Sequence, residues 1–150
     1  MAKTVFAIAS DHAGFDLKTH IQSVLGDEFE FIDLGTHSID SVNYADYGYA
    51  IADAVAGGEA AMGIAICGTG IGISIAANRH PAIRAAVCTS VEMAKLARMH
   101  NDANILALGA RIIDPDLAVE CVRVFAATGF EGGRHIPRVQ SLCRIWQDDE

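Results

Sequence analysis

The sequence is poor in positive charge: 11 lysine and arginine residues stand against 19 aspartate and glutamate residues, for a formal net charge of −8. Binding to a nucleic-acid backbone or to an anionic membrane requires an extended field of Lys and Arg, so this deficit argues against both partners. A small anionic ligand stays compatible with the composition if the few cations are concentrated at one site.

Long hydrophobic runs are missing as well. No stretch reaches the roughly 18 uncharged apolar residues that a transmembrane helix needs. Residues 1–5 do not begin a signal-like apolar segment with a cleavage site. We therefore expect a soluble, cytoplasmic protein with no membrane partner.

Cysteine and histidine are too scattered to form a recognisable metal site. The six histidines contain no H-E-x-x-H pair. The four cysteines form neither a C-x-x-C knuckle nor a dense disulfide framework. We expect no metal, no cofactor and four reduced thiols, which are Cys67, Cys88, Cys121 and Cys143.

The chain has the length of one domain, which we place at residues 1–150. Short apolar runs alternate with helix-period segments, a pattern typical of successive βαβ units around a buried parallel sheet. The predicted fold class is therefore α/β. The apolar runs predict five strands, at residues 5–9, 29–34, 62–66, 83–88 and 105–108.

The end of the sequence predicts two further helices. Asp114 and Pro115 combine an N-cap with a proline at the first helical position, for a helix running to about Thr128. Pro137 is expected to start a last helix, and no further strand is left for that helix to cover. We expect this C-terminal helix to pack on a partner subunit through an apolar stripe of Val139, Leu142, Cys143 and Trp146.

Polar residues cluster where the predicted elements end. Ligands of open parallel sheets bind at the carboxyl ends of the strands. The residues that follow strands or close a helix are Asp11 and His12, residues 67–72, residues 109–111, and His100 with Asn101 at the end of the fourth helix.

The segment at residues 67–74 places Gly68, Gly70 and Gly72 between a strand and a helix. Such a loop lets backbone N–H groups point at an anion near the helix N-terminus. It matches neither the Walker loop nor G-x-G-x-x-G, so nucleotide binding is disfavoured. The alternative is that these glycines serve only a tight turn.

Cys67 stands at the start of this loop, where convergent amides can stabilise a thiolate. It is therefore a candidate base. Taken alone, a cysteine is more often a small buried apolar residue than a base. We assign that structural role to the other three cysteines.

Three further candidates carry a structural alternative each. Asp11 could cap a helix, and His100 could be a cation at a helix C-terminus. The cluster of Arg134, His135 and Arg138 predicts a phosphate site in a chain with few cations. Its alternative is an ordinary solvated surface.

Four segments together resemble one family. From residue 5 to about residue 145 the chain resembles ribose-5-phosphate isomerase B, of the wider group that includes the galactose-6-phosphate isomerase subunits. The motifs follow that family's order: Ser10-Asp11-His12-Ala13-Gly14, Cys67-Gly68-Thr69-Gly70-Ile71-Gly72-Ile73-Ser74, His100-Asn101-Asp102 and Gly132-Gly133-Arg134-His135.

The resemblance implies a three-layer α/β/α, Rossmann-like subunit that forms a homodimer or homotetramer with shared active sites. It implies interconversion of D-ribose 5-phosphate and D-ribulose 5-phosphate in the pentose phosphate pathway. Two alternatives stay open: isomerisation of a six-carbon sugar phosphate such as allose or galactose 6-phosphate, and a non-catalytic phosphosugar-binding protein.

The resemblance also implies residue roles. Cys67 would move a proton between C1 and C2, and Thr69 would assist proton movement between the oxygens. His100, supported by Asp11, would open the furanose ring. The enediolate would be held by Gly68, Gly70, Ile71 and Gly72, and the residues around sugar and phosphate would be His12, Tyr44, Asn101, Arg111, Arg134 and Arg138, the last two from the partner chain. The Pro that often follows Tyr44 in the family is Ala45 here.

Overall fold

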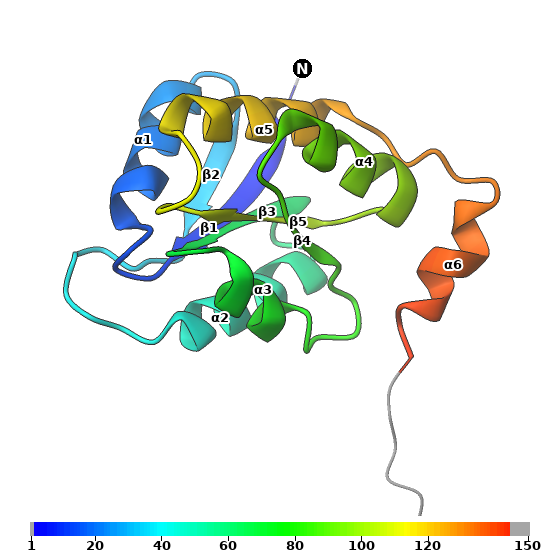
Figure 1. Ribbon diagram of the computed structural model, residues 1–150, viewed down its shortest axis with the longest axis horizontal. Coiled ribbons are helices and arrows are strands. Elements are labelled where there is room, and N and C mark those ends of the chain that lie inside the picture. Colours follow the sequence, from blue (N-terminus) through cyan, green and yellow to red (C-terminus); the bar gives the residue numbers. More distant parts are fainter. Residues whose placement is uncertain (1, 145–150) are drawn as a thin grey trace, which may run out of the picture.

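The computed structural model describes residues 2–144, which form a parallel sheet between two helical layers (Figure 1). All strand pairs are parallel, and the strand order is β2-β1-β3-β5-β4. The predicted α/β class with a five-stranded parallel sheet is confirmed. The strands are β1 (Val5–Ser10), β2 (Glu30–Asp33), β3 (Met62–Cys67), β4 (Ala85–Val87) and β5 (Ile105–Gly109).

The helices divide between the two faces of the sheet (Figure 1). One face carries α1 (Phe15–Leu25), α4 (Val91–Asn101) and α5 (Pro115–Ala127), and the other carries α2 (Tyr44–Ala56) and α3 (Ile71–Ala77). The short α6 (His135–Ser141) lies beside α4.

Successive side chains of a strand point to opposite faces of the sheet, so each face has its own hydrophobic core. Large β1 and β3 side chains such as Phe6, Ile8 and Ile64 face α1, α4 and α5. Small side chains such as Ala7 and Ala9 face α2 and α3 and let those helices approach the sheet closely. The apolar runs of the sequence reflect this burial on both faces.

The connections between the strands locate the expected binding crevice. From β1 the chain crosses to β2 at one edge of the sheet, whereas from β3 it crosses to β4 at the opposite edge. The strand order therefore reverses between β1 and β3. In open parallel sheets, ligands bind at the carboxyl ends of the strands at this point.

Two boundary predictions at the helix starts have different outcomes. The Asp114 side chain accepts the backbone N–H of Asp116 at 2.9 Å, and Pro115 is the first helical residue, as predicted. The last helix, in contrast, begins at His135 rather than at Pro137. Proline is tolerated in this first turn because its missing N–H would have had no helical acceptor.

The predicted stripe on the C-terminal helix is only partly present. Since α6 ends at Ser141, Leu142 and Cys143 lie beyond it, and both are exposed. The expectation that Cys143 is a buried apolar residue is therefore wrong. Trp146 lies outside the described residues.

Among residues 2–144 there is no helix whose length and apolar character would suffice to cross a bilayer.

Candidate active site

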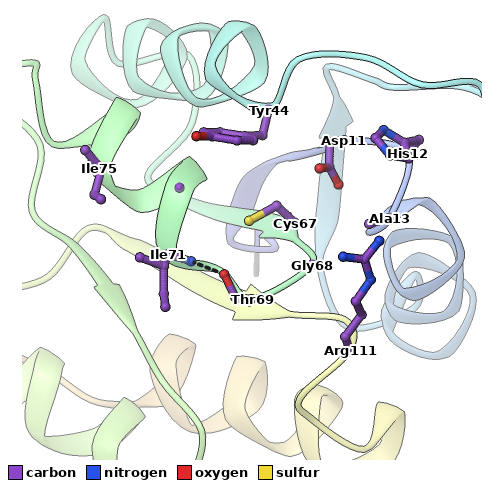
Figure 2. Close-up of a pocket in the computed structure, with 11 residues that line it drawn as sticks. Asp11, His12, Ala13, Tyr44, Cys67, Gly68, Thr69, Ile71, Ile75 and Arg111 are labelled. Atoms are coloured by element: carbon purple, nitrogen blue, oxygen red, sulfur yellow. Dashed lines mark hydrogen bonds between the residues drawn. The ribbon is translucent and has the colours of Figure 1, made fainter.

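A pocket of about 490 Å³ opens at the carboxyl ends of β1 and β3, where the strand order reverses. Figure 2 shows the side chains of Asp11, Cys67 and Arg111 converging on it from different segments. The predicted site residues that line it are Asp11, His12, Tyr44, Cys67, Gly68, Thr69, Ile71, Gly72 and Arg111.

Cys67 is the last residue of β3, and its sulfur faces the pocket (Figure 2). The side chain is only 4% exposed. The backbone N–H of Gly70 donates a hydrogen bond to Sγ at 3.2 Å. A donor aimed at sulfur stabilises the thiolate more than the thiol, so the loop that follows Cys67 supports its use as a base.

The other buried cysteines have a different environment. Cys88 and Cys121 belong to the apolar core on the α4 and α5 side of the sheet. Burial, with a contribution from Cys121, raises the pKa of Cys88 to about 12. Burial also raises the pKa of Cys121, with Glu120 adding to the effect. These two thiols therefore remain protonated and structural, as predicted.

The glycine loop is held tightly against its neighbours. Gly70 has φ +79°, and an added Cβ would lie 2.9 Å from the carbonyl carbon of Leu108 in β5. A Cβ on Gly72 would lie 2.6 Å from two ring carbons of Tyr44. The alternative of a structural turn is thus correct in part, since Gly70 is required by both conformation and space.

Some backbone amides of the loop donate hydrogen bonds within the loop, and another is left for a ligand in the pocket. Gly70 donates to Cys67, and Ile71 donates to the Thr69 hydroxyl at 3.2 Å. The helix begins at Ile71, so Gly72 lies in its first turn rather than before it as expected. First-turn amides have no acceptor within the helix. Gly72 therefore offers the pocket an N–H for a negative oxygen.

Asp11 and His12 follow β1 and are each fixed by a backbone donor. Asp11 is buried, and its Oδ1 accepts the N–H of Gly14 at 3.1 Å, a local turn contact at the start of α1. His12 Nδ1 accepts the N–H of Val42 at 3.2 Å. The neutral His12 ring must then carry its proton on Nε2, which makes that atom a donor.

Arg111 brings a cation to the pocket from the segment after β5. A Cβ on Gly68 would lie 2.9 Å from Arg111 Nη1, so the guanidinium passes directly over this glycine. Arg111 is exposed, and it lines the same pocket as Cys67. A guanidinium in this place suits an anionic substrate.

A second group of predicted residues lies away from this pocket. His100 and Asn101 end α4, Arg134 is the N-cap of α6, and Arg138 lies within α6. The helix α4 leads into the amino end of β5, whereas the pocket lies at the carboxyl ends of the strands. One chain therefore does not bring these residues to Cys67.

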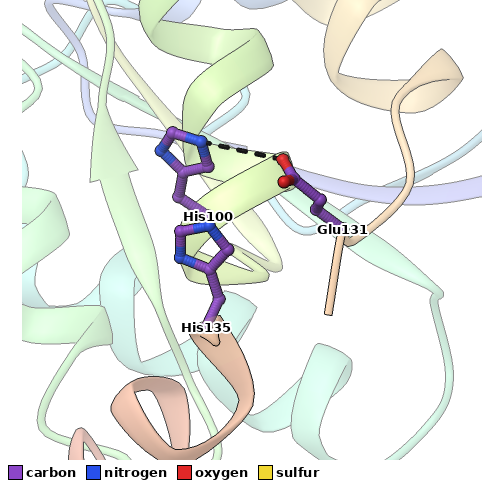
Figure 3. Close-up of side chains that lie close together, drawn as sticks. All are labelled: His100, Glu131 and His135. Atoms are coloured by element: carbon purple, nitrogen blue, oxygen red, sulfur yellow. Dashed lines mark ion pairs between the residues drawn. The ribbon is translucent and has the colours of Figure 1, made fainter. Parts of the chain in front are cut away.

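His100 has two close neighbours, His135 and Glu131 (Figure 3). Its ring stacks on that of His135, with centroids 4.4 Å apart and planes 15° apart. Its Nε2 lies 3.8 Å from Glu131 Oε2. The sequence placed His135 in the predicted phosphate cluster with Arg134 and Arg138, and it did not single out Glu131.

The three side chains place potential metal ligands within 4.8 Å of one another. A metal bound by imidazole lies in the plane of the ring, along the nitrogen lone pair. Two nearly parallel stacked planes share no such point. The arrangement is therefore not preformed for a metal, and Arg134 adds positive charge beside it.

The pocket also has lining residues that sequence reasoning missed, namely Ala13 and Ile75. Both are apolar residues without a distinctive pattern. Only their proximity to Cys67 and Tyr44 in the folded chain reveals them.

Comparison with known proteins identifies close relatives. Residues 6–142 match a family model described as Ribose/Galactose Isomerase. The chain is 46% identical to ribose-5-phosphate isomerase B of Escherichia coli over 142 residues, covering 94% of this chain and 95% of that protein.

Solved structures share the fold as well as the sequence. Ribose-5-phosphate isomerase B of Clostridium thermocellum has a TM-score of 0.92 and 51% identity, covering 93% of this chain and 95% of that one. The Mycoplasma genitalium enzyme with bound ribulose-5-phosphate has a TM-score of 0.89 and 36% identity, covering 95% and 96%.

Proposed function

This chain belongs to the ribose/galactose isomerase family, and we propose that it interconverts D-ribose 5-phosphate and D-ribulose 5-phosphate with Cys67 as the base. The observation that carries the proposal is the Cys67 sulfur, which faces the pocket while accepting a hydrogen bond from Gly70. Acid and base groups and an anion-binding cation surround that sulfur.

The reaction starts from the cyclic sugar, so the ring must open first. His100 gives a proton to the ring oxygen as the bond from that oxygen to C1 breaks. Asp11 accepts the proton that the C1 hydroxyl loses, which leaves an open-chain aldehyde. The buried Asp11 carboxylate already lines the pocket.

Isomerisation then needs a proton to move from C2 to C1. The Cys67 thiolate removes the C2 proton, and the resulting enediolate carries its negative charge on O1. The Gly72 amide stabilises that oxygen, Thr69 moves a proton between O1 and O2, and Cys67 returns its proton to C1. A single oxyanion donor contributes about 2.7–4 kcal/mol to such a transition state, and a positioned base gives roughly 10²–10⁴ in rate.

The complete site requires two chains. His100, Asn101, Arg134 and Arg138 gather at the end of α4 and the start of α6, away from the Cys67 pocket. In a twofold homodimer each chain offers one pocket and one such basic group, so two equivalent composite sites form. His100 reaches Asp11, and Arg134 and Arg138 reach the phosphate, from the partner subunit.

The five-carbon substrate is favoured over a six-carbon one by the relatives. The Escherichia coli and Clostridium thermocellum proteins carry the name ribose-5-phosphate isomerase B, and the Mycoplasma genitalium structure holds ribulose-5-phosphate. A pocket that binds sugar phosphate without turnover would not require a base and acids around the same sulfur.

The test is incubation with ribose 5-phosphate in heavy water, followed by NMR. We expect ketose to appear together with solvent deuterium on the sugar. Cys67→Ala should abolish both, because the proton has no other thiolate to accept it. Cys143→Ser is the matched control, since Cys143 is exposed and outside the pocket.

Relative kcat/KM for ribose 5-phosphate and allose 6-phosphate measures substrate preference. A clear excess for the six-carbon sugar would overturn the proposed substrate. Unchanged isotope exchange in Cys67→Ala would overturn the proposed base.

A further inference from the structure

Glu131, His100 and His135 form a compact group (Figure 3) at the end of α4, the helix that leads into the amino end of β5. His135 is buried, with 6% of its area exposed. The side chains of His100 and Glu131 are 36% and 49% exposed. A buried ring thus serves as a platform for a ring that solvent or a ligand can reach.

Backbone contacts fix the three side chains relative to one another. The N–H of Glu131 donates to the carbonyl of Met99 at 3.0 Å, which ties the loop after α5 to the last turn of α4. Gly132 and Gly133 have φ of +72° and +57°, and the N–H of His135 donates to the Gly132 carbonyl at 3.1 Å. The two glycines let the chain turn back so that His135 lies under His100.

The two stacked rings, His100 and His135, have different charged neighbours. Burial lowers the pKa of His135, and the positive charges of His100, Arg134 and Arg138 lower it further, against the opposing effect of Glu131. Hence His135 is neutral at neutral pH. Two charged stacked rings would repel each other, and the Glu131 carboxylate lies beside His100 Nε2. The Glu131 carboxylate and the His135 ring therefore contact the His100 ring at its edge and on its face.

We propose that Glu131 and His135 are positioning residues for His100: the Glu131 carboxylate beside Nε2 orients the His100 ring, and the His135 ring stacked on it holds it in place for opening the sugar ring. The inference rests on the proposed function, because it specifies how the ring-opening acid is maintained. Neither residue transfers a proton to the substrate itself.

Ring opening and proton transfer are separate steps, so the role of Glu131 and His135 can be measured apart from that of the Cys67 thiolate. Ring opening breaks the bond between C1 and the ring oxygen, and the oxygen takes the His100 proton. Ribulose 5-phosphate is already open, so exchange of its C1 hydrogen with solvent needs only Cys67 and the oxyanion donors. Loss of the positioning residues should therefore impair the cyclic substrate selectively.

The variants are Glu131→Gln, His135→Ala and His135→Phe. In Glu131→Gln and His135→Ala we expect kcat/KM for ribose 5-phosphate to fall roughly tenfold or more, within the range that acid catalysis supplies. The rate of C1 deuterium exchange into ribulose 5-phosphate should stay within about twofold of the parent. His135→Phe keeps a flat uncharged ring and should retain more activity than His135→Ala. Glu120→Gln, in an exposed pair with Arg123, is the control.

An equal fall of both reactions in Glu131→Gln, in a folded dimer, overturns the proposed role of Glu131. An equal fall of both reactions in His135→Ala, in a folded dimer, overturns the role of His135. If the parent protein neither isomerises ribose 5-phosphate nor exchanges the ketose hydrogen, the proposed function fails instead.

Discussion

The backbone N–H of Gly70 points at the sulfur of Cys67, 3.2 Å away, from a residue whose φ is +79°. This conformation costs an ordinary residue about 1–2 kcal/mol. Gly70 adopts this conformation at the N-cap of α3, and the conformation sets the direction of its N–H. The contact therefore links the conformation that residue 70 requires to the hydrogen bonding of the Cys67 sulfur.

Gly70→Ala should lower both stability and activity. The new Cβ would meet the Leu108 carbonyl carbon at 2.9 Å in addition to the φ strain. Gly58→Ala is a matched control, since Gly58 has φ +81° but nothing within 4 Å of an added Cβ. Urea unfolding should give a loss of about 1–2 kcal/mol for Gly58→Ala with its kcat intact. A larger loss, and a lower kcat, are expected for Gly70→Ala. Equal effects of the two changes on kcat would contradict the role of the Gly70 amide.

Alkylation should distinguish the four thiols. At pH 8 we expect iodoacetamide to modify exposed Cys143 and pocket-facing Cys67 in the native protein. Cys88, whose pKa is raised to about 12 by burial, and Cys121, whose pKa burial also raises, should not react. Ribose 5-phosphate should slow the modification of Cys67 but not that of Cys143. Peptide mass spectrometry reads each site, and equal protection of both thiols would argue against substrate binding over Cys67.

The free energy of unfolding should depend on which partner of the Lys18–Asp33 ion pair is replaced. Lys18 Nζ lies 2.7 Å from Asp33 Oδ2, with side chains 2% and 28% exposed. Asp33→Asn leaves a buried ammonium without its counter-charge and should cost about 3–5 kcal/mol. Lys18→Met removes the buried charge and should cost less, because the partly exposed carboxylate can still be hydrated. Urea unfolding at pH 7 measures both, and the reverse order would contradict this account.

The same pair should make stability depend on pH. Burial raises the pKa of Asp33, but hydrogen bonds from Lys18 and from the Gly35 amide outweigh it, so the net pKa lies below the ordinary 3.8. A lowered folded-state pKa means that the stabilisation is present above 3.8 and is lost as pH falls through the folded value. The free energy of unfolding of the parent should therefore drop more steeply below pH 3.8 than that of Lys18→Met. Parallel curves would show that the pair has no such effect.

Mixing two inactive variants should restore activity if sites are shared. Cys67→Ala lacks the base, and Arg134→Ala lacks a phosphate cation on the partner side. A mixed dimer then holds one wholly native site and one doubly altered site. Random exchange of subunits should recover roughly a quarter of parental activity. Mixing Cys67→Ala with itself under the same conditions is the control, and no recovery in a verified mixed dimer would contradict a shared site.

Much of the fold follows from local pattern. Apolar runs that are buried on both faces predicted all five strands within a few residues, and Asp114 with Pro115 predicted the start of α5. The last helix was misplaced because proline is equally acceptable at more than one position of a first turn. The edge strand β4 was predicted too long, since hydrophobicity does not report where a hydrogen-bond ladder stops.

The candidate site was predicted to be shared between chains, with Arg134 and Arg138 from the partner, and in the fold His100 and Asn101 lie apart from the Cys67 pocket as well. Position after a strand correctly grouped Asp11, Cys67 and Arg111 in one pocket. It could not group His100 with them. A helix that connects two parallel strands ends beside the amino end of the second strand, whereas the pocket lies at the carboxyl ends. Glu131 carried no signal at all, since its meaning depends on a ring 31 positions away in the chain.

The sequence by itself determined the elements of this protein, the strand-to-helix glycine loop and the residue types able to move protons. These follow from local backbone preference and from the alternation of apolar side chains. Only the tertiary structure decided that Gly70 donates to Cys67, that His100 stacks on His135, and that the pocket and the basic group lie apart on one chain. Such distances depend on how separate segments pack, and no pattern along a single segment encodes them.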